Sequence, residues 1–461
     1  MKAVEIAAKV RAGALSASSV VQSSLALIGA TEPKVNAFTA VLAERALKRA
    51  AQIDKHTRRA ELSLAGVPFA VKNLFDLAGI STLAGSKIER DSPPATRDAL
   101  LVRRLEAAGA ICVGALNMDE YAYGFTTENS HYGPTRNPHD LSRISGGSSG
   151  GSAAAIAAGQ VPLTLGSDTN GSIRVPSSLC GIFGLKPTYG RLPRLGSYPF
   201  VASLDHLGPF ARSVADLAFA YDAMQGPAPD DPHCAQRPPE PTRTTLDARA
   251  EGLRVAVLGG WFREMAMAEA TAAVDAVAQA LGTSRLVELD GVDRARAAAF
   301  LITNSEGATL HLADLKKRAQ DFEPLSRDRF LAGALLPSAW IVQAQRVRHA
   351  FARQLARVFE TVDVLIAPAT PCVAPVIGTE WLEMAGQRLP ARASMGLLTQ
   401  PISCIGLPVV TVPLWGMNPA LPHLPIGVQV IAAPWREDHA LRVAAQLEAL
   451  GLASAPVAAL N

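Results

Sequence analysis

The sequence predicts an α/β fold built on a β-sheet that contains parallel strand pairs. An apolar run at residues 66–71 is typical of a buried strand, and residues 98–108 have the spacing of a helix. A second apolar run follows at residues 110–113. This strand–helix–strand order is typical of parallel neighbours in an α/β sheet. With 461 residues, of which 49% are hydrophobic, the chain can also bury a large core.

The other predicted elements continue this alternation along the chain. An N-terminal helical segment is expected over about residues 1–60, with helices at 4–12, 18–28 and 41–53. Further strands are expected at 161–166, 181–186, 253–258, 362–367, 409–412 and 426–431. Further helices are expected at 213–224, 268–281, much of 296–357 and 437–450.

One proline-rich segment interrupts this pattern. Residues 226–244, GPAPDDPHCAQRPPEPTRT, have the composition of a linker and could mark a domain boundary. By length alone the chain could form two or three domains. Composition therefore leaves the number of domains open.

Charge and cysteine content narrow the class of protein. The 44 basic and 41 acidic residues nearly balance, and no run is rich in Lys or Arg, so we expect no direct nucleic-acid partner. The five cysteines are widely spaced and lack zinc-like spacing, so neither a metal nor another cofactor is expected. Unpaired thiols also suit a reducing, cytoplasmic location.

The apolar runs are too short for a membrane protein. No run reaches the roughly 18 apolar residues that a spanning helix needs. At the N-terminus, Glu5, Lys9 and Arg11 interrupt any signal-peptide core. We therefore expect neither a membrane span nor a secretory signal.

Residues 144–176 form the most unusual stretch, with Gly and Ser packed around two apolar runs. A phosphate-binding loop would need Lys where Ser152 stands, and the dinucleotide fingerprint is absent. Residues 146–150 match the G-x-S-x-G elbow, but the preceding NPHDLSRIS does not resemble the buried strand that this elbow requires. A simple Gly/Ser linker would not lead directly into apolar segments.

A second serine and a distant lysine suggest a different chemistry for this stretch. Ser148 and Ser172 both lie in Gly-rich turns, and Lys72 ends the apolar run before it. A serine hydroxyl needs a base to become nucleophilic, and a buried lysine with a lowered pKa can serve as one. The alternative for Lys72 by itself is a solvated surface lysine.

Together these residues resemble the amidase signature family. Lys72 lies in PFAVKN, Ser148 in GGSSGGS and Ser172 in GSDTNGSIRVP, followed by CGIFGLKPTYGRLP. Similar segments continue to IAPATP, GLPVVTVP and PIGVQVIA, so the likeness covers nearly the whole chain. It implies the amidase signature fold, a large twisted mixed β-sheet covered by helices on both sides. It also implies one domain over residues 1–461, with 226–244 as an excursion.

The same resemblance implies a role for each site residue. Ser172 would be the nucleophile, Ser148 a bridging serine preceded by a cis peptide, and Lys72 the base. An oxyanion hole would be formed by the backbone N–H groups around Thr169, Asn170, Gly171 and Ser172.

Two neighbouring groups of residues have other interpretations. Asp168 and Arg174 flank the nucleophile, and we predict that they form a pair that shapes the loop, with a surface salt bridge as the alternative. His206 beside Asp205 suggests a Ser-His-Asp arrangement. We instead interpret this segment as a structural turn before Gly208.

Two positions bear on the substrate. The surroundings of Arg329 are similar to those of an arginine that binds carboxylate in glutamine-using relatives, with a surface helix arginine as the alternative. Those relatives usually carry an acid before Leu-Leu-Thr that holds the substrate ammonium, whereas this chain has Gly396 there. A substrate with a carboxylate but no α-amino group is therefore expected.

Within the family, segments such as LGGWFRE, QDFEPLS and IAAPW are similar to the branch that hydrolyses 1-carboxybiuret in cyanuric acid breakdown. This implies an amidohydrolase that cleaves a C–N bond of a small carboxylated ureide through an acyl-serine and releases ammonia. It further implies a partner, a small helical subunit, together with a dimer of such pairs. The alternatives are the glutaminase subunit of a glutamyl-tRNA amidotransferase, a broad-specificity amidase, and a non-catalytic scaffold.

Overall fold

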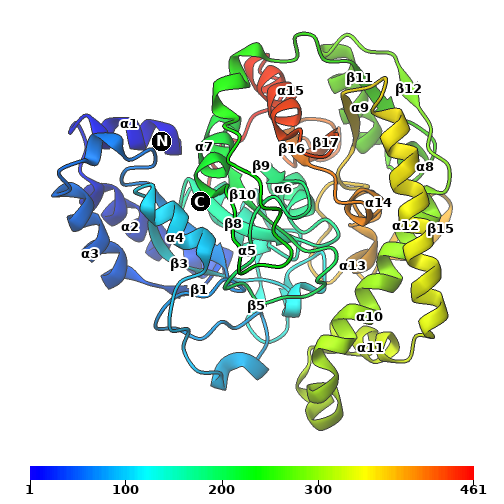
Figure 1. The fold of residues 1–461 in the computed structure, drawn as a ribbon, viewed down its shortest axis with the longest axis horizontal. Coiled ribbons are helices and arrows are strands. Elements are labelled where there is room, and N and C mark those ends of the chain that lie inside the picture. Colours follow the sequence, from blue (N-terminus) through cyan, green and yellow to red (C-terminus); the bar gives the residue numbers. More distant parts are fainter. Residues whose placement is uncertain (461) are drawn as a thin grey trace.

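An 11-stranded mixed sheet runs through the computed structural model, which describes residues 1–460 (Figure 1). Its strand order is β1-β3-β2-β8-β10-β9-β16-β17-β13-β11-β12. The strands are β1 (Phe38–Val41), β2 (Pro68–Lys72), β3 (Ile111–Leu116), β8 (Leu163–Asp168), β9 (Phe183–Lys186), β10 (His206–Ala211), β11 (Val255–Leu258), β12 (Leu286–Val287), β13 (Val364–Pro368), β16 (Val409–Leu414) and β17 (Ile426–Ala432).

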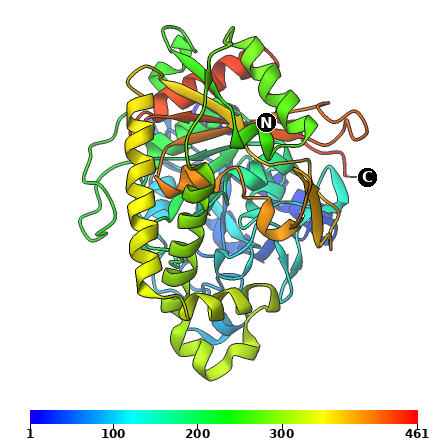
Figure 2. The same cartoon turned by 90° about the vertical axis from the view of Figure 1, so that its right-hand side faces the viewer.

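The helices pack around this sheet along its whole length (Figures 1 and 2). They are α1 (Ala3–Arg11), α2 (Ala17–Val35), α3 (Ala43–Asp54), α4 (Leu100–Ala107), α5 (Gly150–Ala157), α6 (Arg174–Cys180), α7 (Val214–Met224), α8 (Trp261–Glu264), α9 (Ala268–Ala280), α10 (Val292–Arg318), α11 (Pro324–Ala334), α12 (Ser338–Val358), α13 (Ala391–Ser394), α14 (Gln400–Cys404) and α15 (Glu437–Ala449). Every residue of the central strands β8, β10, β9, β16 and β17 is buried, so both faces of the sheet are covered there.

The predicted parallel pairing is confirmed at the N-terminal half of the sheet. β2 and β3 run parallel with α4 between them in the chain, and β8 adds a further parallel neighbour to β2. The carboxyl ends of β2 and β8 therefore meet at one edge of the sheet. Most other neighbours are antiparallel, and this makes the sheet mixed.

Three predicted segments differ from the structure. α2 continues to Val35 through Pro33, because Thr31 and Ser24 on this helix hydrogen-bond Gln160. Residues 38–41 form the edge strand β1 on β3 before the predicted third helix begins. The turn predicted at His206 is wrong, because residues 206–211 form strand β10 and pair with β8 over their whole length.

The proline-rich segment 226–244 connects α7 to η4 (Arg243–Ala248), and strands on both sides of it in the chain belong to the same sheet. The long helices α10 and α12 pack against each other, and α11 also packs against α10 (Figure 2). No helix within residues 1–460 combines the length and the apolar character needed to cross a bilayer.

The first helix is anchored by a side chain from α7. Asp216 accepts hydrogen bonds from the backbone N–H groups of Ala3 (3.0 Å) and Val4 (2.8 Å) at the start of α1. These N–H groups have no acceptor within the helix itself. Asp216 therefore joins the ends of two elements more than 200 residues apart in the chain.

We expect Asp216→Ala to lower the free energy of unfolding by about 1–3 kcal/mol, because buried N–H groups lose a charged acceptor. Urea denaturation would measure this loss. Asp293→Ala, at an exposed position in the first turn of α10, is the control and should change little. Equal stability of the Asp216 variant and the native chain would contradict the anchoring role.

Candidate active site

Lys72 lies at the carboxyl end of β2 and is fully buried. Its Nζ donates to Ser148 Oγ at 2.6 Å and to Ser167 Oγ at 2.9 Å. The surface alternative for this lysine is therefore wrong. Ser167 reaches it because β8 runs parallel to β2 as its neighbour, so the ends of both strands meet.

Burial sets the charge of Lys72. Removal from water lowers its pKa to about 7, although the carboxylates of Asp119, Asp168 and Asp205 oppose this shift. A substantial fraction of the amine is then neutral near pH 7. A neutral amine between two serine hydroxyls can accept a proton from one of them.

Ser148 lies in a turn that only glycine neighbours allow. The Gly147–Ser148 peptide is cis, as the resemblance implies. A side chain at Gly147 would collide with the Asp119 carboxylate and the backbone at Thr126. The N–H of Asp119 also donates to the Ser148 carbonyl at 3.3 Å. This packing holds the Ser148 hydroxyl toward Lys72.

Ser172 follows β8 in a loop fastened by a buried ion pair. Arg174 binds Asp168 through two hydrogen bonds of 3.0 Å, and both side chains are fully buried. Burial disfavours ionisation of Asp168, but Arg174 outweighs this and holds the Asp168 pKa well below its usual range. The predicted pair is confirmed, and the surface alternative is wrong.

The residues before Ser172 form a cluster of unengaged backbone donors. Among residues 1–460, no acceptor is bound by the N–H groups of Thr169, Asn170, Gly171 or Ser172. Gly171 has φ +143°, and a side chain there would collide with Thr399, so this position requires glycine. The Thr399 hydroxyl in turn donates to the Asn170 carbonyl at 2.7 Å. The arrangement can bind a developing oxyanion.

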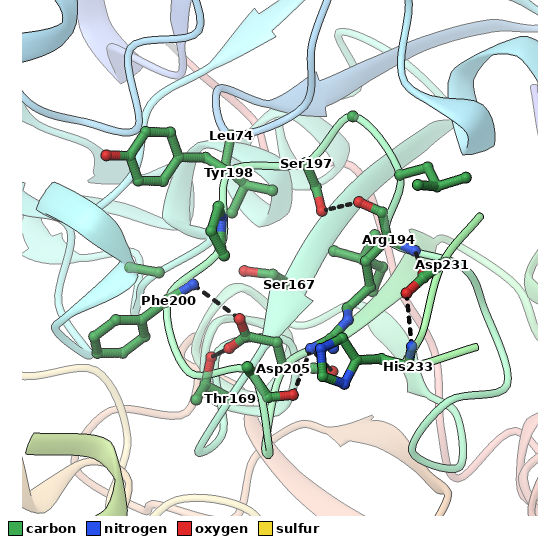
Figure 3. A pocket seen from close by; sticks show the side chains of 16 residues that line it. Leu74, Ser167, Thr169, Arg194, Ser197, Tyr198, Phe200, Asp205, Asp231 and His233 are labelled. Atoms are coloured by element: carbon green, nitrogen blue, oxygen red, sulfur yellow. Dashed lines mark hydrogen bonds between the residues drawn. The ribbon is translucent and has the colours of Figure 1, made fainter. Parts of the chain in front are cut away.

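Two cavities meet at this loop. The larger holds about 290 Å³ of water-accessible space and is lined by Ser167, Thr169 and Asp205 (Figure 3). The Asp205 carboxylate accepts from the Thr169 hydroxyl and from two backbone N–H groups of the opposite wall. The narrower cavity, called here the Ser172 cavity, holds about 10 Å³ of such space. Ala122, Thr169 and Phe200 line both cavities, so the two cavities adjoin each other.

The Ser172 cavity contains Arg329. This residue lies on α11, and its guanidinium carbon is 3.7 Å from the ring centre of Tyr123. Burial lowers the pKa of Arg329 from its ordinary value. No carboxylate among residues 1–460 forms an ion pair with it. The cavity therefore contains a half-buried cation near Ser172. The alternative interpretation of Arg329, as an arginine on the surface of a helix, is wrong.

Gly396 lies beneath the wall of the same cavity. A side chain at position 396 would collide with the Phe125 ring, and that ring lines the Ser172 cavity. Phe125 thus occupies the space that an acid at position 396 would need. The acid that would bind a substrate ammonium is therefore absent from position 396, and the apolar Phe125 ring occupies the space it would need.

His206 does not take part in this constellation. Its Nδ1 bonds the main-chain oxygen of Asp168, and within residues 1–460 no hydrogen bond joins it to Ser148 or Ser172. Likewise, no hydrogen bond connects Ser148 Oγ with Ser172 Oγ in the described chain. The sequence analysis did not identify Ser167. The signal that could have identified it is its place near the end of β8, a strand that runs parallel to β2.

The five cysteines are unpaired and buried. Residues 1–460 contain no group of three or more His, Cys, Asp or Glu side chains arranged to hold a metal ion. The polar groups described at the site include Lys72, the three serines Ser148, Ser167 and Ser172, a cluster of backbone donors and Arg329.

The profile of the Amidase family matches residues 19–441. The chain belongs to the amidase family. Amidases hydrolyse C–N bonds of amides, and this chain is an amidohydrolase of that class. In this family member the buried amine of Lys72 bonds the hydroxyls of Ser148 and Ser167.

Relatives of this amidase include the AtzE subunit of the 1-carboxybiuret hydrolase of Pseudomonas sp. (strain ADP). It is 59% identical over 98% of this chain and 99% of the relative. The glutamyl-tRNA(Gln) amidotransferase A-type subunit of Anaeromyxobacter sp. (strain K) is 39% identical over 96% and 95% of the two chains. One solved structure, described as an unexpected vestigial protein complex that reveals the evolutionary origins of an s-triazine catabolic enzyme, is 58% identical. Its TM-score is 0.96 over 99% of this chain and 100% of that one.

If neutral Lys72 is the base, kcat/KM should rise about tenfold per pH unit below pH 7 and level off above it. Initial rates of ammonia release between pH 5.5 and 8.5 would measure this limb. Burial also raises the pKa of Glu323 to about 7. Glu323→Gln is therefore the control, and the limb should persist in it. A flat native profile would exclude Lys72 as the titrating base.

Proposed function

We propose that this amidase hydrolyses the terminal amide of a small carboxylated ureide, 1-carboxybiuret, and releases ammonia. The observation that carries this proposal is Arg329, a cation without a carboxylate partner among residues 1–460 in the same narrow cavity as Ser172. A guanidinium suits a planar carboxylate. The 59% identity to one subunit of a 1-carboxybiuret hydrolase gives further support.

In the proposed mechanism, neutral Lys72 accepts a proton from Ser148 while Ser148 accepts one from Ser172. The Ser172 oxygen then forms a bond to the amide carbon, and the N–H groups of residues 169–172 bind the resulting oxyanion. The C–N bond breaks, and the departing nitrogen takes the relayed proton and leaves as ammonia. Water, deprotonated along the same relay, cleaves the acyl-serine and restores Ser172.

The glutaminase function is the main alternative, since a glutaminase-type component of an amidotransferase is a relative at 39% identity. Glutamine carries an α-ammonium, which would be costly to bury without a negative partner. The Phe125 ring against Gly396 leaves no room for an acid at that position. The site therefore favours a carboxylate without an ammonium group.

We further propose that a small helical subunit binds this chain and that two such pairs form a dimer. The description of the 58% identical structure as a complex supports this. Exposed apolar side chains on α11, on α12 and in the turn between them, including Leu331, Trp340 and Leu335, offer surface for such contacts. We also propose a single domain over residues 1–461 and a cytoplasmic location, supported by the shared sheet and the free thiols.

Ser172→Ala and Lys72→Ala should each lower turnover of 1-carboxybiuret by at least about 10⁴-fold, because the nucleophile or its base is lost. Ammonia release by the purified protein, in the presence of any partner protein, would measure this. Ser152→Ala is the matched control, since this buried hydroxyl bonds the Leu165 carbonyl and faces no proposed step. Substantial turnover by either site variant in a folded protein would contradict the mechanism.

Arg329→Ala should raise KM for carboxylated ureides by about 10- to 100-fold, because charge-assisted hydrogen bonds are lost. Its effect on neutral biuret should be small. Steady-state kinetics on both substrates would compare the two. Arg327→Ala on the same helix is the control, since Arg327 pairs with Asp328 away from the cavity. An equal effect on both substrates would rule out carboxylate binding by Arg329.

A further inference from the structure

An amide oxygen in the wall of the Ser172 cavity is buried and has no hydrogen-bond donor among residues 1–460. It is Oδ1 of Asn170, two positions before Ser172 in the loop between β8 and α6. Asn170 is only 6% exposed. Buried polar atoms are rarely left unpaired in folded proteins. An unpaired acceptor in a cavity wall therefore indicates a donor that comes with the ligand.

Asn170 is held in place through both its side chain and its main chain. Its Nδ2 donates to the Thr303 hydroxyl of α10 at 2.8 Å, and this directs Nδ2 away from any other partner. Its main-chain oxygen accepts from the Thr399 hydroxyl at 2.7 Å. Thr303 and Thr399 are themselves buried. The free oxygen is thus a fixed feature of the wall.

The other polar side chains of this wall are two donors and four hydroxyls that can donate or accept, those of Tyr123, Thr169, Ser172 and Thr303. Arg329 offers its guanidinium N–H groups. Gln400 also lines the cavity, and its Oε1 already accepts from Arg296 Nε at 3.0 Å, so its remaining amide group is a donor. A complementary substrate therefore presents acceptors to Arg329 and Gln400 and an N–H to Asn170.

We propose that Asn170 Oδ1 accepts a hydrogen bond from the N–H that joins the reacting carbonyl to the carboxylate-bearing remainder of the substrate. The site would thereby select ureides over simple amides. This inference rests on the proposed function, because it places the acyl group between Ser172 and Arg329. A simple amide, glutamine included, carries a methylene at that point and leaves the buried oxygen unpaired.

A matched pair of ligands tests this selection. β-Ureidopropionate and glutaramate both carry a carboxylate at the same chain distance from a carboxamide, and they differ only by NH against CH₂ beside the carboxamide carbon. Calorimetric binding to the full-length Ser172→Ala protein avoids turnover. We expect β-ureidopropionate to bind about 10- to 100-fold more tightly.

Variants assign this preference to Asn170. Asn170→Leu, which keeps the size of the side chain, should reduce the preference to within about threefold. Thr303→Val should reduce it as well, whereas Thr303→Ser keeps the hydroxyl and should preserve it. Melting temperatures of all variants would confirm that they fold.

Two results would overturn the inference: equal affinities of the two ligands in the Ser172→Ala protein, or an unchanged preference in Asn170→Leu, which includes equal weakening of both ligands. Turnover of 1-carboxybiuret by the native enzyme is measured separately. If the enzyme turns over 1-carboxybiuret but shows no preference for β-ureidopropionate, only the role of Asn170 is refuted. If the preference for β-ureidopropionate is found but 1-carboxybiuret is not turned over, only the proposed substrate is refuted.

Discussion

The buried pair of Asp168 and Arg174 is the constraint on which the site depends. Asp168 ends β8, and its carboxylate accepts the N–H of Ile173 as well as the guanidinium of Arg174. Arg174 reaches further, to Gln429 of β17 and the carbonyl of Thr399. One ion pair therefore fixes the loop that carries Ser172 against strands from both halves of the sheet. Removing one partner of such a pair leaves an uncompensated buried charge.

The same low-polarity interior produces the base. Lys72 is buried because β2 lies inside the sheet between β3 and β8, and its desolvation favours the neutral amine. Lys186 shows that burial alone is not sufficient for this role. Burial also lowers the pKa of Lys186 to about 7, but its Nζ donates to the carbonyl groups of Leu407 and Pro187, and within residues 1–460 no hydrogen bond joins it to a serine hydroxyl. Lys72 therefore differs from Lys186 in its hydrogen-bond partners, the hydroxyls of Ser148 and Ser167, more than in its pKa.

Selectivity comes from segments far apart in the chain that share one narrow cavity. Arg329 on α11 supplies the positive charge, and Phe125 against Gly396 removes the space for an ammonium-binding acid. Asn170 supplies the acceptor proposed to recognise an N–H. Arg329 suits the carboxylate of either substrate, whereas the other two features disfavour glutamine: Phe125 fills the space of an acid for its ammonium, and Asn170 would meet a methylene in place of an N–H. Together they make the site suited to a flat, carboxylated ureide.

The sequence by itself determined the local pieces of this protein. Apolar periodicity located most helices and strands, and the Gly-rich turns with two serines and a strand-end lysine located the reacting groups, because these signals lie within short segments. It did not show β1 or β10, since an edge strand and a proline-containing strand depend on partners elsewhere in the chain.

Only the tertiary structure decided the environment of those pieces. It placed Ser167 on Lys72, brought Phe125 against Gly396, put Arg329 in the cavity of Ser172 and left the Asn170 oxygen unpaired. Apart from Asn170, these relations join residues about 95 to more than 250 positions apart. Desolvation, collision and the satisfaction of buried polar atoms depend on such long-range contacts, and for this reason no local pattern could reveal them.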